Sequence, residues 1–485
     1  MRALLPLLLC LFLVGCTDKR PTATEHIDQM PDISPDYISV TIPEQIAPLN
    51  FEVTTHRKLS VLFEADDYQF VVNANKGSLQ IPPSKWCKLL AHAKGKNIRV
   101  TVHAKENNTW KSFIPFSIYV SDDAIDPYVA YRLIAPGYQL WSEMGIYQRE
   151  LASYKQTAVL ENKQTGNNCM NCHSFCDRDP DKMMLHIRAA HGCTVLWNDG
   201  KIETLNTKAD KAMSALVYPY WHPSGKYIAF SVNNTTSQDT HPIHRTEVYD
   251  KASDIVVFDV EKKEIVTTKY LFSAKQFETF PAFSPDGKYL YFCTAEAAKM
   301  PDQLNDLRYN ICRIPFDAAN RSFGTEVDTL FHAAQEEASA LLPRISPDGR
   351  YLLFTTTDYG TFPIWHANAD LRMIDLTDDT TLSMDEVNSP QADSYHAWSS
   401  NSKWILFSSR RIDGLYTRLF IAHVDADGQL SKPFLLPQQS PQHDALLMQS
   451  YNIPEFVKGK VTVNSYKLAS TVKEGDNKPV SFMNR

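Results

Sequence analysis

The sequence predicts an all-β protein, in which a β-propeller of five to six blades, with six preferred, follows a small immunoglobulin-like β-sandwich. The first observation is a segment of the type Ser-Pro-Asp-Gly between two apolar runs, which recurs four times at a spacing of about 60 residues. The second is that further short strand-like runs follow each copy. The third is a group of about six strand-like runs between residues 37 and 122.

Each copy of the repeat predicts a β-hairpin. The four copies are residues 218–230, 280–292, 342–354 and 395–407. An apolar strand enters the turn, where Pro sets φ and Gly accepts a positive φ, and an alternating strand returns. In the fourth copy Ser-Ser-Asn-Ser at 399–402 replaces Ser-Pro-Asp-Gly, which leaves the type of that turn open.

Additional strand candidates follow the copies. They are residues 254–260, 309–316, 371–376 and 418–424. Four strands per repeat is the content of one propeller blade, and one blade cannot bury its faces alone. We therefore expect several blades to pack around a common axis over residues 211–457.

The N-terminus begins with a targeting segment at residues 1–15. Its apolar run is too short to span a bilayer and ends in Leu-Val-Gly-Cys, which resembles the lipobox of bacterial lipoproteins. That resemblance implies cleavage before Cys16 and lipid on its thiol. Because Thr17 and not Asp follows, it also implies anchoring to the outer membrane, on the periplasmic face. The alternative is an ordinary secretory signal.

The remaining segments divide by composition. Residues 16–36 are polar and rich in proline, so we expect a flexible tether. Residues 37–122 form the sandwich, with a short helix expected at 84–93. Residues 123–210 carry a cysteine motif and supply the first blade or blades, and residues 458–485 are expected to be a poorly ordered tail.

The cysteine motif is Cys-Met-Asn-Cys-His at residues 169–173. This is the attachment signature of a c-type haem. Cys169 and Cys172 can each add to one vinyl group of a porphyrin, and His173 can then serve as the proximal axial ligand. The targeting segment agrees with this prediction, because haem c is attached outside the cytoplasm in bacteria.

Two other readings of the motif stay open. One is a zinc site formed by Cys169, Cys172 and Cys176 with Cys193 or His191, since close sulfur and nitrogen pairs suit tetrahedral ligation. The other is a disulfide or redox pair. A thioredoxin-like motif would need a βαβ setting, and none is visible around these residues.

The predicted distal ligand of the haem iron comes from residues 183–189. If this run is a strand, Met184, His186 and Arg188 share one face. We therefore predict His186 as the distal ligand, with Met184 as the alternative and His191 third. Arg188 is expected to pair with a haem propionate.

The chain has nine cysteines. One leaves with the signal, Cys16 takes lipid and two take haem, so five remain. Cys293 and Cys312 lie on neighbouring strand candidates, which predicts a disulfide between them. Two buried free thiols are the alternative.

Several function classes are excluded. The chain contains no G-x-S-x-G, Walker A or H-E-x-x-H motif. Its net charge is −7 with no basic stripe, so no nucleic-acid partner is expected.

The combination of lipobox, sandwich, C-x-x-C-H motif and repeats resembles the TolB-like (WD40-like repeat) β-propeller lipoproteins of Gram-negative bacteria that carry a cytochrome c motif. This resemblance indicates the fold better than the activity. The predicted covalent haem on a lipid-anchored protein favours electron transfer to or from a docked partner, with no enzyme activity. The alternative is a propeller that binds a protein or glycan, in which the haem or zinc is structural or sensory. A haem peroxidase is the third hypothesis.

Overall fold

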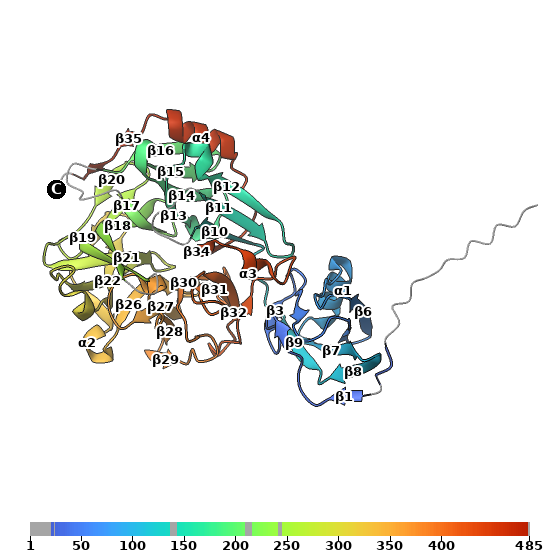
Figure 1. Ribbon diagram of the computed structural model, residues 1–485. Coiled ribbons are helices and arrows are strands. Elements are labelled where there is room, and N and C mark those ends of the chain that lie inside the picture. The colour runs from blue at the N-terminus through green and yellow to red at the C-terminus, as the bar shows by residue number, and fades with distance from the viewer. Residues whose placement is uncertain (1–20, 24, 136–142, 209–215, 241–244, 484–485) are drawn as a thin grey trace, which may run out of the picture.

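The structure is a computed structural model that describes residues 21–23, 25–135, 143–208, 216–240 and 245–483. It contains a small N-terminal unit and a ring of six β-sheet blades (Figure 1). The targeting segment and Cys16 lie outside the described residues. Within the described part of the chain, no helix is long and apolar enough to cross a membrane.

The N-terminal unit contains one seven-stranded sheet, a two-stranded ribbon and one helix. The sheet consists of β1 (Glu25–Ile27), β3 (Thr41–Pro43), β5 (Leu59–Ala65), β6 (Tyr68–Ala74), β7 (Lys96–Glu106), β8 (Thr109–Phe113) and β9 (Phe116–Ser121). The ribbon pairs β2 (Ile33–Ser34) with β4 (Glu52–Val53). The predicted helix is present as α1 (Pro83–Ala93).

The expectation that residues 16–36 form a flexible tether is wrong for the part that forms strands. β1 pairs in parallel with β8, and β2 pairs antiparallel with β4. Residues 25–34 therefore contribute strands to the N-terminal unit. Composition did not reveal this, because two- and three-residue strands are too short to show a period.

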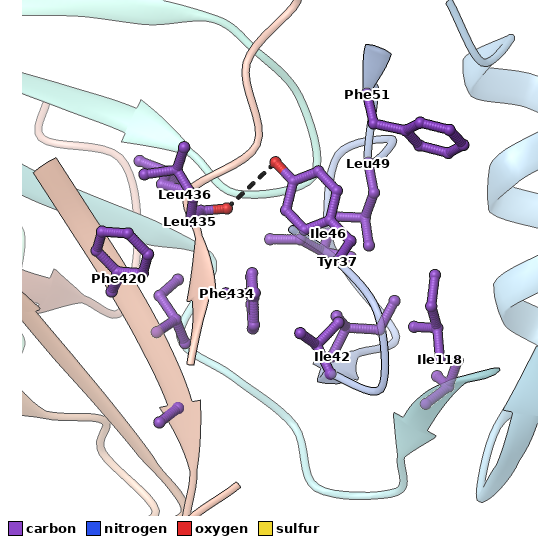
Figure 2. Packing of buried hydrophobic residues seen from close by; sticks show 14 of the residues in the cluster. Tyr37, Ile42, Ile46, Leu49, Phe51, Ile118, Phe420, Phe434, Leu435 and Leu436 are labelled. Carbon is purple, nitrogen blue, oxygen red and sulfur yellow. Dashed lines mark hydrogen bonds between the residues drawn. The ribbon is translucent and has the colours of Figure 1, made fainter. Parts of the chain in front are cut away.

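The N-terminal unit packs against the last blades of the ring through a continuous apolar core (Figure 2). The Tyr37 hydroxyl donates a hydrogen bond to the Leu435 carbonyl at 3.4 Å. His423 Nε2 lies 2.7 Å from Asp123 Oδ2, just after the N-terminal sheet. These contacts join the two units into one packed structure.

Five blades are built in chain order. Blade 1 consists of β13 (Met170–Phe175), β14 (Lys182–Ile187), β15 (Cys193–Asn198) and β16 (Lys201–Asn206). Blade 2 consists of β17 (Leu216–Trp221), β18 (Tyr227–Thr240), β19 (Arg245–Asp259) and β20 (Glu264–Val266). Blade 3 consists of β21 (Gln276–Phe283), β22 (Tyr289–Glu296), β23 (Asn310–Asp317), β24 (Ser322–Phe323) and β25 (Asp328–Phe331). Blade 4 consists of β26 (Ser339–Ile345), β27 (Tyr351–Thr357), β28 (Asp370–Asp375) and β29 (Thr380–Leu382). Blade 5 consists of β30 (Asp393–Trp398), β31 (Trp404–Ser409), β32 (Arg418–His423) and β33 (Phe434–Leu435).

Blade 6 combines both ends of the ring-forming chain. Its outer strands are β10 (Tyr128–Ile134), β11 (Met144–Glu150) and β12 (Gln156–Glu161), and its inner strand is β34 (Ser450–Val457). β10 pairs antiparallel with β34, which closes the ring. The preferred count of six blades is therefore confirmed.

The repeated turns have the predicted conformation. Gly287 and Gly349 adopt positive φ values of 72° and 79°. Ser346 Oγ donates to the Asp348 carboxylate, and the Tyr351 amide donates to Ser346 Oγ at 2.8 Å. The turn left open in the fourth copy is of the same kind, because Ser402 takes the place of Gly with φ 62°.

The C-terminal tail is folded, which corrects the expectation of disorder. After β34 the chain forms α4 (Ser465–Glu474), whose buried face packs against the core between blades 6 and 1. β35 (Lys478–Pro479) then adds to β16, and β36 (Ser481–Phe482) adds to β20. In Figure 1 this red segment lies across the green strands of the first two blades.

The prediction of a Cys293–Cys312 disulfide is wrong, because both thiols are free. The pairing register sets Phe292, not Cys293, opposite Cys312. Side chains alternate along a strand, so the two thiols lie on opposite faces of blade 3. Cys293 packs towards blade 4, and Cys312 packs towards blade 2.

Two matched glycine substitutions test how the turns hold the ring together. A Cβ at Gly287 would lie 2.3 Å from His222 Nε2 of blade 2, whereas a Cβ at Gly349 meets nothing within 4 Å. We expect Gly349→Ala to lower the free energy of unfolding by about 1–2 kcal/mol through its positive φ alone. Gly287→Ala should lower the free energy of unfolding by about 1–3 kcal/mol more, because the new Cβ also clashes with His222. Denaturant unfolding measures both, and equal losses would contradict this account.

Candidate functional site

A cavity of about 420 Å³ occupies the centre of the ring. Every inner strand contributes side chains to it, among them His173, Tyr220, Phe283, Arg344, Trp398 and Glu455. A pocket of this size, with aromatic walls and a few charged groups, is typical of a small-molecule or cofactor site. The cavity is therefore the candidate functional site.

The inner strands share an irregularity that shapes this cavity. Their pairing with the second strand shifts register once, as in a β-bulge. The residues with positive φ at this place in blades 2 to 6 are Tyr218, Phe280, Leu342, Tyr395 and Ile453. The residues that follow them are Pro219, Pro281, Pro343, His396 and Pro454.

The haem motif occupies the same place in blade 1. The register of β13 against β14 shifts between Asn171 and Ser174, so Cys172 and His173 form the bulge. His173 corresponds to the proline of blades 2, 3, 4 and 6 and to His396 of blade 5, and it lines the central cavity. The side chain of Cys172 lies outside the described residues.

His173 is buried without a hydrogen-bond partner. Its exposed fraction is 2%, and neither ring nitrogen bonds to any described group. Glu455 Oε1 lies 3.6 Å from Nε2, which is too far for a hydrogen bond. Burial lowers the pKa of His173 to about 3, with a smaller contribution from Arg132. The imidazole is therefore neutral, which is the form that binds a metal.

Glu455 shares the cavity with His173. Its Oε2 accepts a hydrogen bond from the Phe175 amide at 3.1 Å, while Oε1 has no described partner. Burial raises the pKa of this carboxyl to about 8. Glu455 is therefore mainly neutral at pH 7.

Cys169 lies immediately before β13. It is partly buried and forms no disulfide. Its carbonyl accepts a hydrogen bond from the Arg188 amide at 2.8 Å, so the segment after β14 lies beside the thioether position. The Arg188 side chain is exposed. The structure thus brings Cys169 and Arg188 together.

The predicted distal ligands lie elsewhere. His186 Nδ1 is 3.0 Å from Thr194 Oγ1, and burial lowers the pKa of His186 to about 3. Met184 is fully buried in the core between blades 1 and 2. Neither residue lines the central cavity that His173 faces.

The zinc alternative gains no support from the described side chains. In that part of the chain, no three His, Cys, Asp or Glu residues lie close enough to hold a metal ion. Cys176 packs in the core towards blade 2, and Cys193 packs in the core towards blade 6. These two thiols therefore lie on opposite faces of blade 1.

The haem reading meets a more favourable geometry. A buried, neutral imidazole whose ring nitrogens have no described hydrogen-bond partner faces a cavity of cofactor size, and Cys169, which forms no disulfide, lies immediately before the same strand. Buried polar groups are nearly always satisfied, so His173 indicates a missing partner. The proximal residues therefore fit the group, while the distal residues are not positioned for it.

Sequence reasoning missed the charged residues of the cavity. In five of the six inner strands the residue after the proline or histidine position lines it; these residues are Ser174, Tyr220, Arg344, Ala397 and Glu455. Aligning the repeats on this position would have found them. Blades 1 and 6 lack the repeated turn, which hides the place of Ser174 and Glu455, and the pattern around Arg344 in blade 4 does not show that this part of the strand faces the axis.

Histidines of blades 2 and 5 form hydrogen bonds to neighbouring blades. His222 Nε2 lies 3.1 Å from the Gly287 carbonyl, and His396 Nε2 lies 3.0 Å from the Leu353 carbonyl. Each bond joins neighbouring blades. These contacts give both residues a structural role.

A scan against protein-family models and a search of curated proteins find no match. Similar solved structures include a puromycin-hydrolysing peptidase of Mycobacterium tuberculosis, at 12% identity and a TM-score of 0.36; the alignment covers 82% of this chain and 57% of that one. A periplasmic gluconolactonase of Pseudomonas aeruginosa aligns at 13% identity and a TM-score of 0.35, over 64% of this chain and 97% of that one. The β-propeller domain of the Trilobed protease from Pyrococcus furiosus aligns at 9% identity and a TM-score of 0.33, over 70% and 81%.

These scores are too low to carry an argument about activity. The chain spans only 57% of the length of the peptidase. The assignment of a six-bladed propeller rests on the strand pairing of this chain itself.

The carboxyl of Glu455 makes stability depend on pH. Its pKa is raised from 4.5 to about 8 on folding, so the unfolded chain releases this proton first. The wild type should lose up to about 1.4 kcal/mol per pH unit from this group as pH rises from about 4.5 to 8. In Glu455→Gln the unfolding free energy should not show this decrease with rising pH. In the control Glu326→Gln, which changes an exposed carboxylate and leaves Glu455 intact, the decrease should remain. Unfolding free energies measured from pH 5 to 9 test this, and parallel curves would contradict it.

Proposed function

We propose that this protein is a lipid-anchored periplasmic β-propeller with a covalent haem c on Cys169 and Cys172, and that it exchanges electrons with a partner docked on the propeller. The observation that carries the proposal is His173, the histidine of the C-x-x-C-H motif. It is buried at the central cavity, and neither ring nitrogen has a described partner. A proximal axial ligand needs a neutral imidazole with a free nitrogen.

Different residues of the protein would bind different parts of the haem. Cys169 and Cys172 would supply the thioether bonds, His173 the proximal ligand, and Arg188 a cation for a propionate. When bound, the haem would supply a one-electron iron couple. The protein would exclude water with the aromatic walls of the cavity, which lowers the local dielectric.

The distal ligand is proposed to come from β14, as His186 or in its place Met184. Both side chains lie in the core between blades 1 and 2. Ligation by either residue requires this face of β14 to separate from blade 2. A Met ligand would raise the reduction potential relative to a second His.

Location and partner follow from the resemblance to TolB-like propeller lipoproteins. The proposed lipid on Cys16 anchors the protein to the outer membrane, on its periplasmic face. A ring of blades offers two broad loop-bearing faces on which a protein can dock, and such loops often carry binding residues.

A second candidate is a binding protein for a protein segment or glycan. The cavity of about 420 Å³ and its aromatic lining support it. In that case a haem or zinc at the same cysteines would be structural or sensory. Reversible reduction with sharp α and β bands distinguishes electron transfer from this role, and turnover of peroxide would indicate a peroxidase.

Covalent haem is tested by expression with a c-type maturation system. We expect the protein to keep its colour through acid–acetone extraction, because thioether bonds survive it. Cys169→Ser with Cys172→Ser should abolish the attachment, whereas Cys87→Ser, an exposed thiol of the N-terminal unit, should not. A folded, colourless wild type containing zinc would refute the proposal.

The lipid anchor is tested by cell fractionation. Wild type should sediment with membranes, and Cys16→Ser should be released, since no other membrane-anchoring segment is proposed. A wild type that is already released as a free periplasmic protein would contradict the anchor. Detergent extraction of the membrane fraction serves as a control for aggregation.

A further inference from the structure

The central cavity contains a cation for which the described residues show no ion pair. Arg344 lies on β26, directly after the bulge of blade 4. Its Nη1 donates one hydrogen bond, to the Pro343 carbonyl at 2.8 Å. The structure shows no ion pair for this guanidinium, although burial lowers its pKa.

Two other arginines of the propeller have more partners than Arg344. Arg418 donates to the carbonyls of Asp444, Leu447 and Gln449. Arg411 forms an ion pair with Asp393 at 2.8 Å. A guanidinium has five N–H donors, so Arg344 retains capacity for a planar two-oxygen acceptor.

The walls around Arg344 would suit a flat apolar body. The guanidinium stacks over the Tyr220 ring at 5.0 Å, and the Trp398 indole donates to the Arg344 carbonyl at 3.2 Å. These contacts hold the cation in place, which reduces the entropy lost on binding. Stacking leaves the edge of the guanidinium for in-plane hydrogen bonds.

The two acidic side chains of the cavity form no described ion pair with Arg344, although Glu455 interacts with it electrostatically. Asp177 pairs with Arg178 at 3.1 Å and with Lys458 at 2.7 Å. Glu455 accepts from the Phe175 amide and forms no ion pair with Arg344. An incoming anion would therefore meet a net positive lining.

We propose that Arg344 binds the carboxylate of a ligand that lies in the central cavity, with the aromatic walls covering its apolar part. Two sources have this chemistry: a free aromatic or aliphatic carboxylic acid, or a propionate of the covalent haem. The first source is independent of the proposed function, and the second rests on it. The experiment separates them.

The first arm uses the full-length Cys169→Ser, Cys172→Ser protein, which cannot carry haem. 3-Phenylpropionate is titrated against its uncharged amide by calorimetry and ligand-detected NMR. We expect the acid to bind more tightly than the amide. Arg344→Gln should weaken binding of the acid by roughly ten- to a hundred-fold, the range for a lost charge-assisted pair. The affinity for the amide should not change.

Two further variants serve as controls. Arg99→Gln removes an exposed cation on the N-terminal sheet and should leave binding unchanged. Arg344→Lys keeps the charge but loses the two-pronged geometry, and its binding should be intermediate. It also replaces Arg344→Gln if that protein fails to fold.

The second arm uses the haem-loaded wild type and Arg344→Lys. If the carboxylate is a propionate, the free acid does not bind the haem-free protein, and the substitution changes the pH dependence of the reduction potential. Binding of the free acid that depends on Arg344 supports the first source, even in a protein that proves to carry no haem. If neither effect is observed, the proposal is overturned.

Discussion

The antiparallel pairing of β10 with β34 is the interaction on which the ring depends. It joins a strand before the repeats to a strand after them, so blade 6 exists only when both ends have met. Without it, the inner faces of blades 1 and 5 would be left uncovered. The central cavity, which needs one wall from each inner strand, exists only in the closed ring.

The second constraint is the bulge that interrupts each inner strand. A bulge reorients side chains locally, and here it turns a short run of each strand towards the axis. Proline suits this place because the ladder hydrogen bond is already lost there. In blades 1 and 5 a histidine replaces the proline. His396 of blade 5 bonds to the Leu353 carbonyl of blade 4, whereas His173 of blade 1 presents to the channel an imidazole without a described hydrogen-bond partner.

Local chemistry made the blades predictable and left the long-range features hidden. The repeated turns identify four hairpins, with Ser-Pro-Asp-Gly in two copies and variants of it in the other two, and Ser402 shows that the turn persists without glycine. Nothing local indicates that β34 pairs with β10, or that the tail adds strands to blades 1 and 2.

Within the site, the motif identified His173 but not its neighbours Arg344 and Glu455. Their role depends on where the bulge points them. The failed disulfide has the same origin, since one step of register decides which face Cys312 occupies.

The packing of the N-terminal unit against blade 5 has a consequence for biogenesis. Tyr37 and its apolar neighbours emerge early during synthesis, yet their partners Phe434 and Leu435 are made near the end. Contacts so distant in sequence raise the contact order and slow folding. Until the last blades appear, this apolar face remains uncovered and prone to aggregation. A chain synthesised in this order would benefit from a holding chaperone until its last blades have formed.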